Sequence, residues 1–296
     1  MFARPVTTFD LVPRRVRVHA VRRLTGSMVR TTFRDAPGAD GASGADGVTG
    51  SGGTTGAAAS SVAALHAPGP DDHVKVFLPD PATGVLHAPT LAPDGGIQRP
   101  AGGVSISREM TVRATRTVDG AGEVDVDWVL HAGDGPASAW AAAAREGDEV
   151  VLVGPGTSRA VPAGIGRLTL AVDETGLPAA ARWSAAVGPG VRVTAIVEIG
   201  DDTDEDVVEA ELAGADVEIL YRSDGPGQLA EAVRSLGTPD DDEYVVALGE
   251  AGELVPLRRH LRGLGVGPDL STVAGYWRRG TVNLDPDAPL DPNDPT

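Results

Sequence analysis

The sequence predicts an antiparallel β-barrel followed by a parallel β-sheet with helices on both faces. Up to about residue 160, short alternating apolar segments are separated by turn residues, which is typical of antiparallel barrels. From Gly166 onward, continuous apolar strands alternate with helical segments, which favours a buried parallel sheet. The length of 296 residues favours two domains over one. We expect domains at 1–163 and 164–283, and a disordered tail rich in Asp and Pro at 284–296.

Composition excludes several classes of function. The net charge of −17 argues against a nucleic acid or an anionic membrane surface as partner. The absence of cysteine rules out disulfides, thiolate metal sites and cysteine-held iron–sulfur clusters. The N-terminus lacks the apolar core of a signal peptide, and no run approaches the ~20 apolar residues of a membrane span. We expect a cytoplasmic monomer without membrane insertion.

The first strands of the predicted barrel alternate between apolar and polar residues. Residues 16–33 contain two such stretches around a Thr-Gly-Ser turn and predict a hairpin. Residues 35–70 consist mainly of Gly, Ala, Ser, Thr and Asp, so we expect a mobile surface insertion there. Residues 73–79 predict a strand that buries alternate apolar residues and carries Lys75 on its other face.

The stretch from Ser107 to Ser138 contains the residues most suggestive of ligand binding. Arg108, Thr111 and Arg113 are interpreted as lying at alternating positions of a strand, which would offer cations and a hydroxyl to a dinucleotide. A second strand, 123–131, alternates Val, Trp and Leu with acidic residues, and we expect it to have one buried face. A Gly-rich turn follows, and a helix is expected to begin at Pro136, where its N-terminus favours a phosphate. The segment 148–155 is expected to close the barrel.

The second half predicts strands at 167–173, 191–199, 216–222, 243–249 and 271–277, and helices at 178–187, 206–212, 228–236 and 253–264. Parallel sheets bind ligands at the carboxyl ends of their strands. The candidate binding residues at those ends are Asp173, Glu174, Thr175, Arg222, Gly249, Glu250, Ala251, Tyr276 and Trp277. The sequence contains no G-x-G-x-x-G fingerprint, so this pattern alone does not identify a dinucleotide site.

Several motifs resemble, in order, those of the siderophore-interacting proteins, which are flavin-containing ferric-siderophore reductases related to the ferredoxin reductase superfamily. The family signature R-x-Y-T-x-R corresponds to residues 108–113, and the family's H-G-D-G-P-A-S resembles H-A-G-D-G-P-A-S at residues 131–138. Further matches are DDHVKVFLP at 71–79, DETGLPAAARW at 173–183, GEAGELVPLRRHLR at 249–262 and GYWRRG at 275–280.

The resemblance implies an N-terminal FAD-binding barrel, a Rossmann-like NAD(P)-binding domain, and transfer of electrons from NADPH (or NADH) through FAD to a ferric siderophore, which releases Fe(II). It implies FAD contacts from Arg108, Met110, Thr111, Val112, Arg113, His131, Gly133, Asp134, Gly135, Pro136, Ala137 and Ser138. The strand-end residues named above would bind the nucleotide. Arg222 would either bind the 2′-phosphate of NADPH or pair with Asp224 or Glu218. Lys75 and Arg159 would attract the anionic chelate. We expect no protein metal ligand and no catalytic side chain.

The chain departs from the family pattern at three places. Met110 replaces a tyrosine, Ala132 replaces a glycine, and Arg159 comes later than the arginine that usually follows Gly-Pro in the family. Two alternatives therefore stay open. One is an NAD(P)H-dependent flavin reductase with another acceptor, such as a quinone or a partner protein. The other is a degenerate, flavin-free protein that binds a chelate or partner without turnover.

Overall fold

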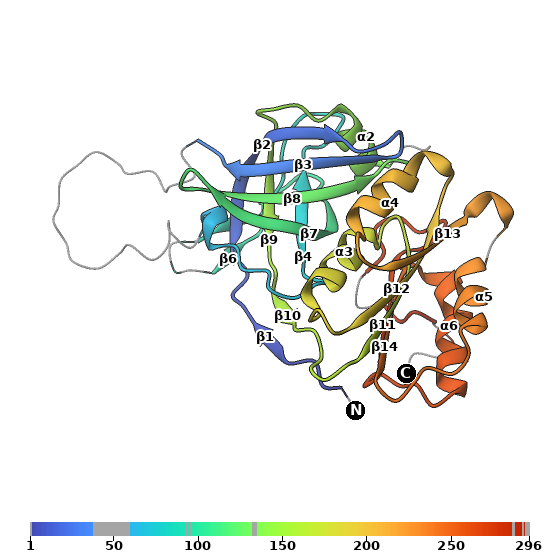
Figure 1. Cartoon of the computed structure of the whole chain (residues 1–296). Helices are drawn as coiled ribbons and strands as arrows, with labels where there is room; N and C mark the ends of the chain where they lie inside the picture. Colours follow the sequence, from blue (N-terminus) through green and yellow to red (C-terminus); the bar gives the residue numbers. More distant parts are fainter. Residues whose placement is uncertain are drawn as a thin grey trace, which may run out of the picture.

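The computed structural model describes residues 2–37, 60–92, 94, 96–131, 135–225, 227–285, 288–291 and 293. A barrel, drawn in blue to green in Figure 1, lies beside a helix-covered sheet drawn in yellow to red. Most of the expected 35–70 insertion and the expected contacts Gly133 and Asp134 lie outside the described residues.

The barrel strands are β2 (Pro13–Arg23), β3 (Met28–Asp35), β4 (His73–Leu78), β7 (Ile106–Val118), β8 (Ala121–Val129) and β9 (Glu149–Val153). They close in the order β2-β3-β8-β7-β4-β9, and every neighbouring pair is antiparallel. The predicted antiparallel barrel is therefore confirmed, with β9 closing it against β2 and β4. Its core contains Phe33, Val76, Val126 and Trp128, all at most 2% exposed. The helix α2 (Pro136–Ala143) contacts β3, β7 and β8.

Residues 60–70 differ from the mobile insertion expected there. They include the 3-10 helix η1 (Val62–Ala64), whose N-cap Ser61 accepts a hydrogen bond from the backbone N–H of Ala63. Val62, Leu65 and Ala67 are buried in the barrel core. The expectation is wrong for this part because three apolar side chains, spaced among small residues, supply the burial that offsets ordering.

Short strands complete the N-terminal half. The strand β1 (Val6–Thr8) pairs with β10 (Thr157–Arg159), and β5 (Thr90–Leu91) pairs with β6 (Ile97–Gln98).

The parallel sheet contains β11 (Arg167–Asp173), β12 (Arg192–Ile199), β13 (Asp216–Tyr221), β14 (Glu243–Glu250) and β15 (Ser271–Trp277) in the order β13-β12-β11-β14-β15. Its helices are α3 (Leu177–Ala186), α4 (Glu205–Glu211), α5 (Gln228–Ser235) and α6 (Ala251–Gly263). Two 3-10 helices, η2 (Asp202–Asp204) and η3 (Arg222–Asp224), follow β12 and β13.

Helices cover both faces of this sheet, as predicted. Leu170 of β11 packs in one core cluster with α3 and α4, whereas its neighbour Ala171 packs in another with α5 and α6. Successive residues of a strand point to opposite faces, so both faces of β11 are buried. Within the described residues, no helix is both long and apolar enough to cross a membrane.

The C-terminal segment also differs from the expected disordered tail. Leu290 is 7% exposed and packs in the α5–α6 cluster, which Leu284 also contacts. Asp291 is buried and pairs with Arg259 of α6. The Asp and Pro content conceals two leucines that anchor the chain on α6, so the expectation is wrong for the described residues between 284 and 291.

Several polar contacts join the barrel to the sheet domain. Arg182 of α3 donates to the carbonyl of Val112 at 2.8 Å and to that of Ala67. Ser27, before β3, donates to the carboxylate of Asp204 at 2.6 and 2.7 Å. These contacts hold the start of α4 and the middle of α3 against the barrel, which places the carboxyl ends of the sheet strands beside β7.

Candidate cofactor and substrate sites

The two faces of β7 carry different residues. Arg108 lies opposite the buried Val76 of β4, whereas Thr111 lies opposite the exposed His73. Directly opposed residues of an antiparallel pair share a face. Arg108 therefore shares the core-side face of Val76, while Thr111 and Arg113 lie on the outer face. The expectation that Arg108, Thr111 and Arg113 occupy alternating positions is wrong for Arg108, because Arg108 and Thr111 are three residues apart and so lie on opposite faces.

Arg108 is a half-buried cation without a carboxylate partner among the described residues. Its Nη1 donates to the carbonyl of Ser107 at 2.8 Å and lies 3.4 Å from Oδ1 of Asn283. Burial lowers the pKa of the Arg108 guanidinium, and no carboxylate of the described residues opposes this effect. A desolvated cation of this kind favours an anion as ligand.

The corner between β8 and α2 lies at the same end of the barrel. Antiparallel pairing places the end of β8 beside the start of β7, and α2 contacts β7 directly. Pro136 is the first helical residue, as predicted, and the N-cap Gly135 makes no side-chain capping bond. A Cβ at Gly135 would lie 2.9 Å from Cε1 of His131, so a larger residue here would have to displace the His131 ring. The N–H groups of Ala137 and Ser138 lie in the first helical turn, where such groups lack an intrahelical acceptor.

Ser138 contributes to the corner through its own turn. Its hydroxyl is buried and accepts a hydrogen bond from the N–H of His131 at 3.1 Å. The hydroxyl therefore fixes the shape of the turn, and the backbone N–H groups are the donors available to a phosphate.

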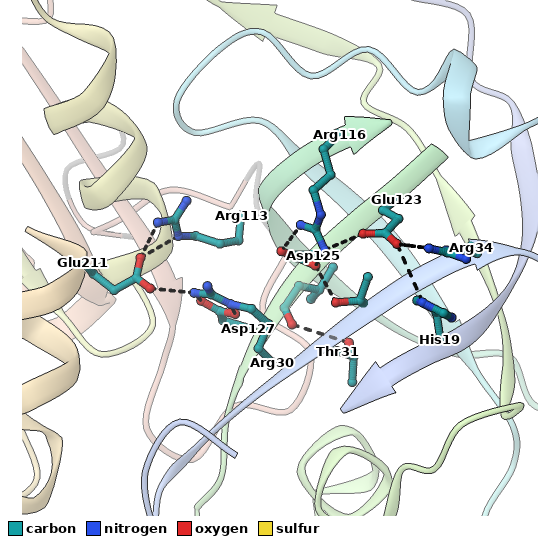
Figure 2. Close-up of polar contacts among 12 residues, drawn as sticks. His19, Arg30, Thr31, Arg34, Arg113, Arg116, Glu123, Asp125, Asp127 and Glu211 are labelled. Carbon is teal, nitrogen blue, oxygen red and sulfur yellow. Dashed lines mark hydrogen bonds and ion pairs between the residues drawn. The ribbon is translucent and has the colours of Figure 1, made fainter. Parts of the chain in front are cut away.

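Arg113 is bound to the sheet domain rather than open to a cofactor. Its Nε donates to Oε2 of Glu211 on α4 at 2.7 Å. Arg30 of β3 donates to the other oxygen of Glu211 at 2.9 Å and also binds Asp127 at 2.5 and 2.6 Å. Figure 2 shows Glu211 between the two arginines. The Arg113 side chain is thus held in an interdomain ion pair, and its expected FAD contact stays a prediction.

The acidic face of β8 is buried as well as its apolar face. Glu123, Asp125 and Asp127 are 5 to 8% exposed. Their cationic partners are Arg34, Arg116 and Arg30, with His19 3.8 Å from Glu123 (Figure 2). The expectation of one buried face is wrong because arginines from neighbouring strands cover the second face.

The remaining signature residues of β7 have separate environments. Val112 is fully buried in the barrel core, so its side chain is not exposed to a ligand. Met110 packs partly buried against the same core. The hydroxyl of Thr111 interacts with that of Tyr276 on β15, and burial raises the pKa of that tyrosine. Tyr276 thus reaches from the sheet domain to the barrel strand, although its sequence position alone does not reveal this contact.

Three strand ends of the sheet meet at Asp173. Its carboxylate accepts hydrogen bonds from Nε1 of Trp277 at 2.7 Å and from the N–H and hydroxyl of Thr175 at 2.8 and 2.5 Å. Burial raises the pKa of Asp173. Gly249 has φ +153°, and a Cβ there would lie 2.7 Å from the Asp173 carboxylate, so a side chain cannot be accommodated. The structure therefore brings the ends of β11, β14 and β15 together as expected.

Glu250 and Ala251 form the start of α6. The carboxylate of Glu250 accepts from the N–H of Glu253 at 2.7 Å and from that of Arg279 at 3.0 Å. Ala251 is 1% exposed. Both residues stabilise the turn after β14, and neither side chain is free in the described structure.

Arg222 is paired with acids that sequence reasoning missed. Its Nη1 and Nη2 bind Glu174 at 3.0 and 2.6 Å, and its Nε binds Glu198 at 3.1 Å. Within the described residues, Arg222 forms no ion pair with Asp224 or Glu218, so the expectation of either partner is not supported. Glu198 is the penultimate residue of β12, next to Ile199 at its carboxyl end, and a carboxylate near a strand end was the available signal.

The two expected chelate-binding cations lie on the outside of the N-terminal half. Lys75 of β4 is 45% exposed and pairs with Glu109 at 2.9 Å. Arg159 on β10 is exposed, and its carbonyl accepts from Arg4 at 2.9 Å. In the part of the chain that the structure describes, no group of three or more His, Asp or Glu side chains is arranged to hold a metal ion.

The closed barrel, followed by a parallel sheet whose strand ends face it, defines a two-domain fold of the ferredoxin-reductase-like class. A ferredoxin reductase of carbazole 1,9a-dioxygenase shares this fold with a TM-score of 0.59 at 15% identity, covering 91% of this chain and 70% of that one. A siderophore utilization protein from T. fusca superposes with a TM-score of 0.77 at 33% identity, covering 97% of this chain and 100% of that one.

The chain belongs to the siderophore-interacting protein family. The siderophore-interacting FAD-binding domain matches residues 57–159, and the siderophore-interacting protein domain matches residues 166–280. The NADPH-dependent ferric-chelate reductase of Escherichia coli strain K12 is 30% identical over 215 residues, which cover 71% of this chain and 80% of that relative. The ferric vibriobactin reductase of Vibrio cholerae is 28% identical over 217 residues, 70% of this chain and 77% of that relative.

Proposed function

We propose that this protein is a flavin-dependent reductase that passes electrons from NAD(P)H through FAD to a ferric siderophore. The family, and the names of two relatives as ferric-chelate and ferric vibriobactin reductases, support this proposal. The structural observation that carries it is Arg108, a desolvated cation without a carboxylate partner in the described part of the chain, at the barrel end where α2 begins. We assign FAD binding to residues 1–163 and NAD(P)H binding to residues 164–283.

The described residues at this end of the barrel fit an FAD diphosphate. Arg108 would make a charge-assisted contact with the diphosphate, and the first N–H groups of α2 would donate to it. Met110, on the same face of β7 as Arg108, would pack against the flavin ring through its polarizable thioether. When bound, FAD supplies the step between a two-electron hydride donor and a one-electron iron acceptor.

The chain would contribute binding and positioning rather than proton transfer. Asp173 and Trp277 hold the ends of β11 and β15 at the face where parallel sheets bind nucleotides. Lys75, although paired with Glu109, is exposed enough to attract an anionic chelate. The iron is substrate, and its reduction to Fe(II) weakens the grip of the hard oxygen ligands of the siderophore.

The test is anaerobic oxidation of NADPH and NADH by the FAD-loaded protein, with and without a ferric siderophore, followed by a ferrous-specific chromogenic chelator. We expect ferrous colour that depends on FAD, nucleotide and protein together. Nucleotide oxidation with a quinone but no ferrous colour would instead identify the reductase with another acceptor. A purified protein that retains no FAD after reconstitution would identify the flavin-free binding protein, the alternative for which the Arg113–Glu211 pair and Met110 are the specific observations.

A further inference from the structure

We infer that the sheet domain takes a dinucleotide whose adenosine ribose carries no 2′-phosphate, so that NADH rather than NADPH is the electron donor. This inference rests on the proposed function and specifies its donor. It is carried by Glu174, Glu198 and Arg222, which come from the carboxyl ends of the neighbouring strands β11, β12 and β13.

The donors of Arg222 that face this site are already used. Glu174 accepts from both Nη atoms, at 3.0 and 2.6 Å, and Glu198 accepts from Nε at 3.1 Å. The side chains of Glu174 and Glu198 are 6% and 2% exposed. One guanidinium thus neutralises one of two buried carboxylates, and the cluster keeps a net charge of −1 when both are ionised. An arginine held in this way is a poor receptor for a phosphate.

Glu198 also offers an acceptor with nothing bound to it. Its Oε2 is buried and has no hydrogen-bond partner among the described residues. A buried carboxylate oxygen without a donor is costly, so the site favours a ligand that donates a hydrogen bond. A ribose 2′-hydroxyl can donate, whereas an ionised 2′-phosphate only accepts.

The position of Glu198 agrees with this assignment. In parallel sheets that bind dinucleotides, a carboxylate about 20 residues after the first strand-to-helix turn binds the ribose hydroxyls, and an arginine nearby receives a 2′-phosphate. Glu198 is the penultimate residue of the second strand of this sheet, and Arg222 follows the third. Both kinds of residue are present, but the carboxylates bind the arginine.

The acidic residues around Glu198 also disfavour a dinucleotide that carries a 2′-phosphate. Glu253 and Asp173 lie close enough to Glu198 to disfavour its ionised form. A 2′-phosphate carries a charge of between about −1.5 and −2 near pH 7, as other phosphate monoesters do. Its entry would break the Arg222–Glu174 pair and would leave Glu174 buried without its cation.

The test compares two fragments that differ only in the phosphate, 5′-ADP and adenosine 2′,5′-bisphosphate, by calorimetric titration of the full chain loaded with FAD at pH 8. We expect 5′-ADP to bind at least tenfold more tightly, and kcat/KM to be at least tenfold higher for NADH than for NADPH. Equal or tighter binding of the bisphosphate overturns the inference, as does binding of neither fragment.

The variant Glu174→Gln tests whether the pairing of Arg222 with Glu174 excludes a 2′-phosphate. Glu174→Gln keeps the shape of the side chain and releases Arg222, so we expect the affinity for the bisphosphate to rise at least tenfold while that for 5′-ADP changes little. Glu218→Gln, an exposed change on β13, is the matched control and should leave both affinities unchanged. The melting curve shows whether the Glu174→Gln protein is folded. If it is folded and the ratio of the two affinities is unchanged, the Arg222–Glu174 pair does not select against the 2′-phosphate.

The two proposals fail separately. A preference for NADPH with ferrous colour overturns the NADH inference and leaves the reductase intact. Absence of ferrous colour with either nucleotide ends the proposed reductase, and the fragment titrations, repeated on the full chain as purified if FAD is not retained, still decide which ribose the sheet domain binds.

Discussion

Arg113 of β7 and Glu211 of α4 form an ion pair that joins the barrel to the sheet domain, with 2.7 Å between Nε and Oε2. Both side chains are less than one quarter exposed, and Arg30 of β3 binds the same carboxylate. The second arginine of the family signature thus holds the two domains together. Glu211 determines where Arg113 lies, and with it the separation of β7 from α4.

Replacing Glu211 with Gln should destabilise the protein. The change leaves Arg113 without a carboxylate and removes one of the two carboxylates that bind Arg30, at a cost of about 2 to 4 kcal/mol in the free energy of unfolding, because the pairs are largely buried. Glu209→Gln, an exposed change on the same helix, is the control and should stay within about 0.5 kcal/mol. Urea denaturation measures both. Equal midpoints for the two variants would show that the ion pairs contribute nothing.

The C-terminal segment provides a second stability test. Leu290→Ala should lower the free energy of unfolding by about 2 to 3 kcal/mol, because a buried leucine is lost from the α5–α6 cluster. Val282→Ala, at a position 79% exposed, should cost less than about 0.5 kcal/mol. A negligible effect of Leu290→Ala in thermal or urea melts would mean that the segment detaches in solution.

The fold was predictable because buried apolar residues recur in the sequence at the regular spacing of a strand or a helix. The expected strand 167–173 coincides with β11, and the expected helix 228–236 differs from α5 by one residue. Alternation at Val74, Val76 and Leu78 identified β4 for the same reason. Each of these elements buries a face whose repeat is visible in a short window.

The site was only partly predictable because ion pairs between residues that are distant in the sequence produce no regular spacing. The partners of Arg113 and Arg222 lie 98 and 48 residues away, at Glu211 and Glu174, on elements that meet only after folding. The alternation argument also failed at Arg108 and Thr111, where a count of positions decides the face. In contrast, the expectation that residues at the carboxyl ends of the parallel strands lie together was correct for Asp173, Gly249 and Trp277.

Arg108→Ala should weaken FAD binding. Loss of a charge-assisted contact is expected to cost about 1.5 to 3 kcal/mol, or roughly 10- to 150-fold in the dissociation constant. Arg17→Ala is the matched control, since Arg17 is an exposed residue of β2, which lies across the barrel from β7. Quenching of flavin fluorescence on titration of the apoprotein measures both. Equal affinities in the two variants would place the diphosphate away from Arg108.

The pH dependence of the free energy of unfolding should report the titration of the Glu198 carboxyl group. Burial, followed by the nearby charge of Glu253, raises the pKa of Glu198 to about 7, from an ordinary value near 4.5, although Arg222 acts in the opposite direction. Because the folded state prefers the protonated form, this stabilising contribution is complete below the ordinary pKa and is lost as the pH rises through 7.

Glu198→Gln removes that titration while keeping the shape of the side chain. The free energy of unfolding of the variant, relative to the natural protein, should therefore rise by about 2 to 3 kcal/mol between pH 5 and pH 8, at about 1.4 kcal/mol per unit of pKa shift. Urea melts at matched pH values measure this difference, and Glu218→Gln, which removes an exposed carboxylate of β13, provides the baseline. A difference that stays constant from pH 5 to pH 8 would mean that Glu198 is already ionised at pH 5. In that case Arg222 outweighs burial, and the cluster that excludes a 2′-phosphate keeps its negative charge from pH 5 to pH 8.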